Sequence, residues 1–190
     1  MIHPEAGPEA FLPDMMSPGS TEDPEEPFCC VFCESGFEPL VVHALEYCGY
    51  GRALFPQRIK PVCRRGVWTD EKRALLPGYV FLRGEAPAYA VRAINHVIRL
   101  LRYEDGTVRL RGGDLDFARM LFQGNGEVQK LRAVRDGDYV RITDDLLKNA
   151  NARVLRVEKR KHLAEVEILL AGTVNRVWLG LDILEPKSIE

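Results

Sequence analysis

The hydrophobic pattern of the chain changes near residue 130, and this change limits the folds that the sequence can form. Before that point, apolar residues at helical spacing alternate with short apolar stretches typical of strands. After it, only short strand-like stretches follow, separated by polar turns. A chain of 190 residues with this pattern has room for two small domains, of which the first is mixed and the second all-β.

The first domain is predicted over residues 28–122. An apolar strand at 28–33 precedes a helix in which Phe37, Val41 and Leu45 recur at helical spacing. Further strands are predicted over 53–55, 79–82 and 97–101, a second helix over 86–96, and a short amphipathic helix over 115–122. The α+β order β-α-β-β-α-β is that of a ferredoxin-like domain, an antiparallel sheet with its helices on one face.

A basic stretch interrupts this domain between the second and third predicted strands. Residues 58–73 are centred on Arg64-Arg65-Gly66, and the glycine with its flanking strand-like residues predicts a β-hairpin.

The second domain is predicted over residues 131–185, after a polar hinge with two glycines at 123–130. Its strands are expected over 139–142, 152–157, 164–170, 173–179 and 181–184. Short strands at this spacing predict a small SH3-like β-barrel. Trp178 lies in an alternating strand and is expected in its core.

Charge is unevenly distributed. Residues 1–27 hold seven acidic residues and no Lys or Arg, so a net charge of −2 for the chain leaves +5 for residues 28–190. The segment 1–27 is rich in Pro and Glu and is predicted to be a disordered tail. The basic remainder is compatible with a polyanionic partner. With no apolar run of about 20 residues and no secretory pattern, we expect a cytoplasmic, monomeric protein without membrane contact.

The five cysteines do not form a metal-binding pattern. Cys30 and Cys33 lie three apart in a predicted strand, where their side chains point to opposite faces, and no second close pair follows. We therefore expect reduced thiols and no metal. Phosphate-binding and nucleophile motifs are absent, and the four histidines stand apart, so the sequence predicts neither an enzyme nor a cofactor.

Three stretches resemble the NusG family of transcription elongation factors. Residues 28–38 (FCCVFCESGFE) are similar to its opening strand and Ser-Gly-x-Glu turn, and residues 75–82 (LLPGYVFL) to its Phe-Pro-Gly-Tyr-Val segment. Residues 137–142 (GDYVRI) resemble the start of its C-terminal KOW domain. The loop at 145–152 departs from the family's glycine-containing turn. The resemblance implies an N-terminal (NGN) domain that binds RNA polymerase.

The resemblance assigns polymerase binding to an apolar depression that contacts the clamp helices. The matching positions are Phe28, Leu76, Pro77 and Tyr79. Exposed apolar groups suit such a contact because their burial supplies most of the binding energy. The alternative is that Phe28 and Leu76 belong to the core.

Two basic sets are candidate nucleic-acid contacts, with ordinary solvated surface as the alternative for each. The hairpin set, placed along upstream DNA, is Arg58, Lys60, Arg64, Arg65, Lys72 and Arg73. The C-terminal set, expected to bind an RNA hairpin, is Lys148, Arg153, Arg156, Lys159, Arg160, Lys161, His162 and Arg176.

The stretches 156–162 and 177–183 resemble LoaP-type paralogs, which implies a processive antiterminator whose KOW domain binds RNA. Two alternatives stay open. One is a general NusG-like factor whose KOW domain binds a ribosomal or termination protein, and the other is an RNA-binding module unrelated to polymerase.

Overall fold

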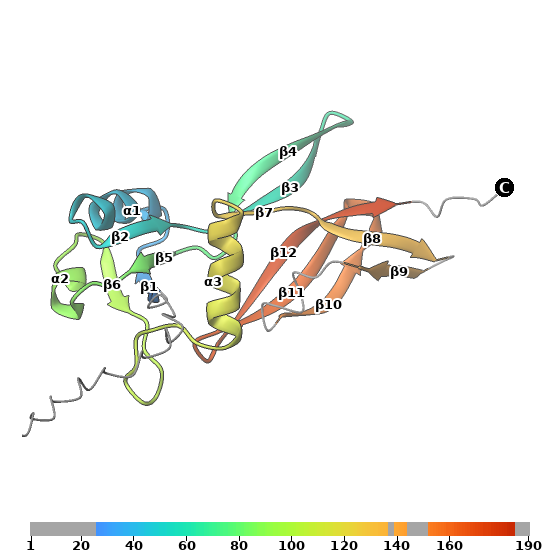
Figure 1. Cartoon of the computed structure of the whole chain (residues 1–190). Helices are drawn as coiled ribbons and strands as arrows, with labels where there is room; N and C mark the ends of the chain where they lie inside the picture. Colours follow the sequence, from blue (N-terminus) through green and yellow to red (C-terminus); the bar gives the residue numbers. More distant parts are fainter. Residues whose placement is uncertain (1–25, 137–138, 144–151, 185–190) are drawn as a thin grey trace, which may run out of the picture.

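The computed structural model describes residues 26–136, 139–143 and 152–184 (Figure 1). It has a mixed α+β architecture with several sheets and few helices, which confirms the predicted class. The tail, apart from its last two residues, and most of the loop at 145–152 lie outside the described residues.

A four-stranded sheet occupies the N-terminal side of the molecule (Figure 1). Its order is β2-β5-β1-β6, and every neighbouring pair is antiparallel. Its elements along the chain are β1 (Phe28–Cys33), α1 (Glu38–Tyr47), β2 (Gly51–Leu54), β5 (Tyr79–Gly84), α2 (Ala88–Arg92) and β6 (Val97–Leu100). This is the predicted element order.

Both faces of this sheet are covered, and the sequence of β1 shows why. Cys29 and Val31 point into a cluster with Val41 of α1, whereas Phe28 and Cys30 belong to a second cluster on the other face. A strand buried on both sides needs apolar residues at every position rather than at alternate ones. The continuous apolar run at 28–33 meets that need.

Helix α2 is shorter than the predicted 86–96. Pro87 precedes its first turn, and His96 has a φ of 68°, which a right-handed helix cannot accommodate. Tyr89, which is expected to face inward in the helix predicted over 86–96, is 79% exposed. The His96 ring instead stacks on Phe37 with ring centroids 3.7 Å apart.

The basic stretch forms the predicted hairpin from β3 (Gln57–Arg64) and β4 (Val67–Ala74), which projects from the body (Figure 1). Arg65 and Gly66 make its two-residue turn with φ values of 52° and 80°. Positive φ at both positions is the geometry that suits the twist of a two-residue hairpin. The predicted hinge at 123–130 contains β7 (Glu127–Val128), which pairs in parallel with β3.

The C-terminal residues form a five-stranded sheet in the order β10-β11-β12-β8-β9. Its elements are β8 (Leu131–Asp136), β9 (Tyr139–Ile142), β10 (Ala152–Glu158), the 3₁₀ turn η1 (Lys159–Lys161), β11 (Leu163–Leu170) and β12 (Thr173–Leu184). Strand β8 has no counterpart among the predicted strands. The two strands predicted at 173–179 and 181–184 are one continuous β12 that pairs with both β11 and β8.

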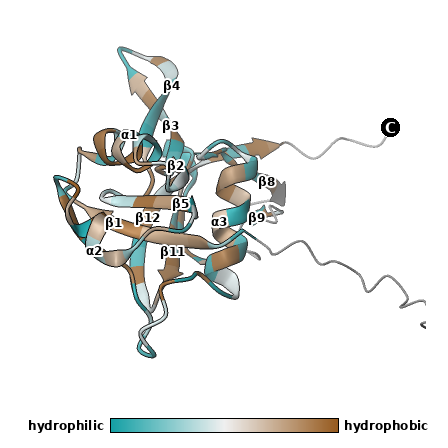
Figure 2. Ribbon diagram, turned by 60° about the vertical axis from the view of Figure 1, so that its left-hand side comes forward, coloured by the Kyte–Doolittle hydropathy of each residue, from teal (hydrophilic) through white to brown (hydrophobic). Residues whose placement is uncertain are grey.

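Helix α3 (Gly113–Gln123) lies between the two sheets (Figure 1). Phe117 and Leu121 are fully buried in a cluster that also contains Ile168 of β11 and Leu179 of β12. The helix also contains the polar residues Asp116, Arg119 and Gln123, so α3 carries both brown and teal in Figure 2. One hydrophobic core therefore joins the two predicted domains.

A buried carboxylate reinforces this junction. Asp114 Oδ2 accepts hydrogen bonds from the Tyr103 hydroxyl at 2.6 Å and from the backbone N–H of Ala171, between β11 and β12, at 3.0 Å. Burial, followed by the bond to Asp114, raises the pKa of Tyr103 to about 12.

Candidate nucleic-acid interface

The first two sequence stretches that resemble the NusG family are joined by one side chain. The buried Glu38 carboxylate accepts the N–H of Gly36 at 2.8 Å and the N–H of Gly78 at 2.6 Å. Gly78 has a φ of +84°, and a Cβ there would lie 2.7 Å from the Cys33 carbonyl oxygen. The Ser-Gly-x-Glu and Pro-Gly-Tyr stretches are therefore parts of one turn structure that requires both Glu38 and Gly78.

The four residues predicted to bind polymerase differ in exposure. Phe28, Leu76 and Tyr79 are buried, and Pro77 is exposed. Phe28 packs edge-on against Phe122 of α3, with ring centroids 5.3 Å apart.

Tyr79 lies where the two sheets meet. Burial raises its pKa, while a hydrogen bond with the Asn175 side chain of β12 acts in the opposite direction. The C-terminal sheet therefore covers part of the predicted polymerase surface, and polymerase binding by these residues stays a prediction.

The basic residues of the hairpin differ in burial and in their ion-pair partners. Nε and Nη1 of Arg58 are buried without a hydrogen-bond partner among the described residues, and burial together with Arg73 lowers its pKa. Arg64 and Arg73 both pair with Glu71 at 2.6 Å, and Lys72 pairs with Glu127. Arg65 is exposed at the turn.

The basic turn, residues 159–162, is the predicted connection between strands. It consists of η1 followed by His162, whose φ of 54° ends the turn. Lys161 pairs with Glu158 at 2.8 Å. Lys159 and Arg160 are exposed and form no ion pair with any other described residue. Their charges are available to an anionic partner.

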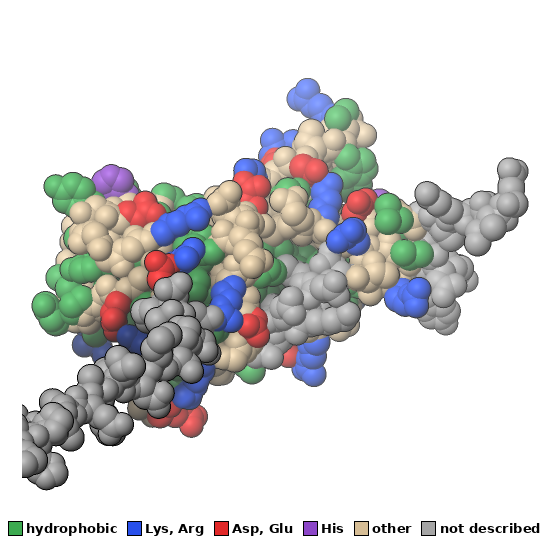
Figure 3. All heavy atoms as spheres, in the orientation of Figure 1, with side chains coloured by type: hydrophobic (Ala, Val, Ile, Leu, Met, Phe, Trp, Pro, Cys, Tyr) green, Lys and Arg blue, Asp and Glu red, His purple; other side chains and the backbone are tan. Residues whose placement is uncertain are grey.

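The other described residues of the C-terminal basic set lie on β10 and β12 and pair with carboxylates of β10 and β11. Arg153 and Arg176 both contact Glu167, at 2.9 and 3.5 Å. Arg156 pairs with Glu158 at 3.0 Å. Lys148 lies outside the described residues. Figure 3 shows Lys and Arg side chains over the hairpin and the adjoining C-terminal sheet, interrupted by carboxylates.

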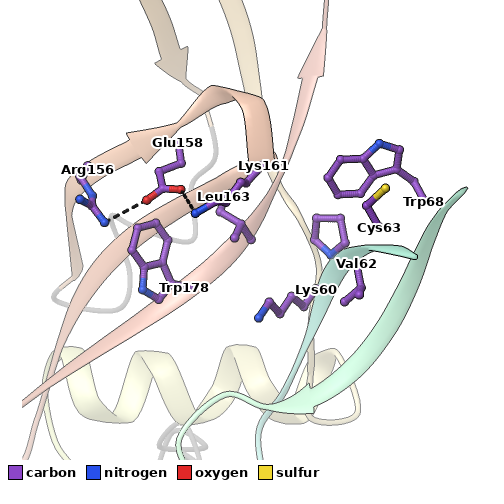
Figure 4. Close-up of a pocket in the computed structure, with 10 residues that line it drawn as sticks. Lys60, Val62, Cys63, Trp68, Arg156, Glu158, Lys161, Leu163 and Trp178 are labelled. Atoms are coloured by element: carbon purple, nitrogen blue, oxygen red, sulfur yellow. Dashed lines mark hydrogen bonds and ion pairs between the residues drawn. The ribbon is translucent and has the colours of Figure 1, made fainter. Parts of the chain in front are cut away.

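The structure brings parts of the two basic sets into one cleft of about 580 Å³ between the hairpin and the C-terminal sheet (Figure 4). Lys60 comes from β3, and Arg156 and Lys161 come from the C-terminal sheet and its basic turn. The sequence interpretation had placed these residues on separate DNA and RNA surfaces. Their convergence depends on the close approach of β3 to β12.

A glycine permits this close approach. A Cβ at Gly180 would lie 2.8 Å from the Ile59 carbonyl oxygen and 3.0 Å from Pro61 Cδ. Lys130 pairs with Asp70 of β4 at 2.7 Å beside the same contact. Gly180 therefore serves the packing of β3 on β12 and does not break the strand.

Two tryptophans lining the cleft were not predicted as site residues. Trp68 is 50% exposed on β4, and Trp178, expected in the core, is only partly buried. The Arg156 guanidinium lies over Trp178 at 5.0 Å from the ring centroid, and the His162 ring lies 5.8 Å from that of Trp68. Placement of Trp68 among the basic hairpin residues is the one sequence signal that could have indicated a binding role.

The cysteines form no metal site in the described part of the chain, where no group of three or more metal-binding side chains occurs. Cys29, Cys30 and Cys33 are buried. Burial is the main cause that raises the pKa of Cys29 to about 12 and that of Cys33 to about 11. These thiols are therefore protonated at neutral pH and unreactive.

No helix in the described ranges has the length and hydrophobicity to cross a membrane.

Comparison with known proteins gives structural neighbours but no sequence relative. No protein-family model matches the chain, and no curated protein matches it either. A solved structure described as domain interaction in Thermotoga maritima NusG is similar, with a TM-score of 0.46 and 16% sequence identity. The match covers 81% of this chain and 93% of that one.

Proposed function

We propose that this protein is a transcription elongation regulator of the NusG type. In this proposal residues 28–122 form a ferredoxin-like NGN domain that binds RNA polymerase, and residues 131–185 form an SH3-like KOW domain that binds RNA. The observation that carries the proposal is the Glu38–Gly78 hydrogen bond. It gives a shared structural role to the two separate sequence stretches that resemble the NusG family, and this supports the proposal.

Polymerase binding through Phe28, Leu76 and Tyr79 requires a change of conformation. These side chains are buried, and Tyr79 interacts with Asn175 of β12. In this proposal a protein partner contacts Tyr79 only when β12 moves away from it, and Phe28 only when Phe122 of α3 is displaced. Pro77 is exposed without that movement.

The polymerase part is tested by pull-down with core polymerase. Alanine at Leu76 or Tyr79 would disturb the core, so the informative change is one that weakens the junction from the C-terminal side. Asn175→Ala should increase polymerase capture because it favours exposure of Tyr79. Tyr89→Ala, an exposed change on α2, is the matched control. Failure of both the wild type and Asn175→Ala to retain polymerase would refute the polymerase part.

The RNA part rests on the basic turn. When its lysines and arginine neutralise RNA phosphates, counterions leave the RNA. The affinity for RNA should therefore fall steeply as the salt concentration rises. A processive antiterminator would use this turn to bind a structured leader RNA, whose loop presents unpaired bases.

The RNA part is tested by reversing the charges of Lys159, Arg160 and Lys161 to Glu. We expect a loss of affinity of about tenfold or more and a flatter salt dependence, with the fold retained because the turn is exposed. Unchanged affinity and salt slope would place RNA binding elsewhere and favour a ribosomal or termination protein as the partner.

A further inference from the structure

The cleft between the hairpin and the C-terminal sheet combines aromatic and cationic side chains. Figure 4 shows Trp178, Arg156 and Glu158 on one side and Trp68, Cys63 and Val62 on the other. The chain has two tryptophans, and both line this cleft. At about 580 Å³ the cleft lies within the usual size range of ligand sites.

The charge of the cleft favours an anion. Lys60, Arg156 and Lys161 contribute three positive charges and Glu158 one negative charge, which leaves an excess of two. Glu158 Oε1 is 3.0 Å from Arg156 and Oε2 is 2.8 Å from Lys161, so the carboxylate is neutralised and holds both cations beside Trp178. These pairs lower the pKa of Glu158, which therefore stays ionised at neutral pH.

We propose that this cleft binds unpaired nucleotides of a single nucleic-acid strand. Bases stack on the Trp178 and Trp68 rings, while Lys60 and Lys161 contact the phosphates and the exposed Lys159 and Arg160 extend the path. Aromatic platforms beside a cationic groove are the general means of binding single strands, and they tolerate different sequences because every base has a π-face.

A duplex does not fit this arrangement, because its bases are stacked on one another and cannot reach an indole. The proposal rests on the RNA part of the proposed function, which identifies the bound strand as RNA. It adds that hairpin and C-terminal sheet bind the same strand, so neither domain alone holds the complete site.

The chain carries internal reporters for a protection experiment. Cys63 lines the cleft and is exposed, Cys48 is exposed at the end of α1, and the other three cysteines are buried. Full-length protein is alkylated with iodoacetamide, with and without saturating oligouridine, and modification of each cysteine is followed by mass spectrometry. We expect alkylation of Cys63 to slow by about tenfold and that of Cys48 to stay unchanged.

Intrinsic fluorescence provides the second measurement, since both tryptophans lie in the cleft. Oligouridine should quench it, whereas an abasic oligomer of the same length, with phosphates but no bases, should not. Trp68→Ala on the exposed hairpin should weaken oligouridine binding by about tenfold, and Tyr47→Ala, exposed on α1, should have no effect. Oligothymidylate in parallel shows whether RNA or DNA is preferred.

Three results obtained with a bound strand would overturn the proposal. These are equal protection of both cysteines, no protection of Cys63 while RNA is bound, and equal affinity for abasic and base-containing strands. Absence of any strand binding would refute it as well. Bound RNA with Cys63 unprotected would leave the RNA part of the proposed function standing, so the two failures are distinguishable.

Discussion

The C-terminal sheet meets the rest of the chain at two contacts of opposite character. At α3 the contact is dry, with Phe117, Leu121 and Leu179 fully buried and Asp114 satisfied by Tyr103 and Ala171. At the hairpin the contact narrows to the backbone at Gly180 and opens into a cleft lined by charged and aromatic groups. The first contact has the features of a core, and the second has those of a binding site.

This difference indicates how the molecule can keep a stable fold and still present a site for ligand binding. Apolar burial at α3 fixes the position of the C-terminal sheet without using any charged residue of the cleft. The cleft residues are then free to differ in sequence without loss of the fold. The following changes test whether the two contacts are independent.

Phe117→Ala should have the largest effect. The side chain is 1% exposed and packs edge-on against Phe81, with ring centroids 5.8 Å apart. Its removal leaves a cavity in the dry contact and should lower the free energy of unfolding by about 3–5 kcal/mol, as measured by urea denaturation. Tyr89→Ala, exposed on α2, is the control. A loss below about 1 kcal/mol would show that this contact is not a true core.

Asp114→Ala should follow in size. The change leaves the Tyr103 hydroxyl and the Ala171 N–H without their acceptor, which should cost about 2–4 kcal/mol. Asp114→Asn keeps an acceptor oxygen and should lose less. Faster hydrogen exchange at the backbone N–H of Ala171 in the variant would show that the loss of stability arises at this junction. Equal destabilisation by Ala and Asn would mean that the charge of Asp114, and not its geometry, stabilises the junction.

Gly180→Ala is expected to act on the other contact. The added methyl group would meet the Ile59 carbonyl oxygen at 2.8 Å, so β3 must shift, at a cost of about 1–3 kcal/mol. Because the shift widens the cleft, alkylation of Cys63 in the free protein should become faster while that of Cys48 stays constant. A change at both cysteines would contradict independence of the two contacts.

The smallest effect concerns pH. The pKa of Tyr103 is raised from 10.0 to about 12 in the folded state, so its contribution to stability is complete below pH 10 and is lost as pH rises toward 12. Tyr103→Phe should cost about 0.5–1.5 kcal/mol near neutral pH and flatten the decline of stability in that window. Denaturation curves for both proteins on either side of pH 10 measure this. An unchanged alkaline slope in the variant would exclude Tyr103 as a contributor.

Local pattern was sufficient to predict the α+β class and the element order of the N-terminal sheet, because periodicity and turn residues are encoded within each segment. The predictions of the Arg65-Gly66 turn and of a connection between strands at 159–162 were likewise correct. Predictions that depended on partners distant in sequence were less successful. Helix α2 ended at Arg92, before the predicted end at His96, β12 continued through Gly180, and β8 was missed.

The sequence by itself determined most of the helices and strands, which faces are apolar, and which stretches are basic. Only the tertiary structure decided that Trp178 faces a cleft, that Tyr79 is covered by β12, and that Lys60 lies with Arg156 and Lys161. The physical reason is the range of the interactions. Periodicity and turn geometry act over a few residues, whereas the cleft arises from one close backbone approach at Gly180 and one shared core at α3, each joining residues far apart in the chain.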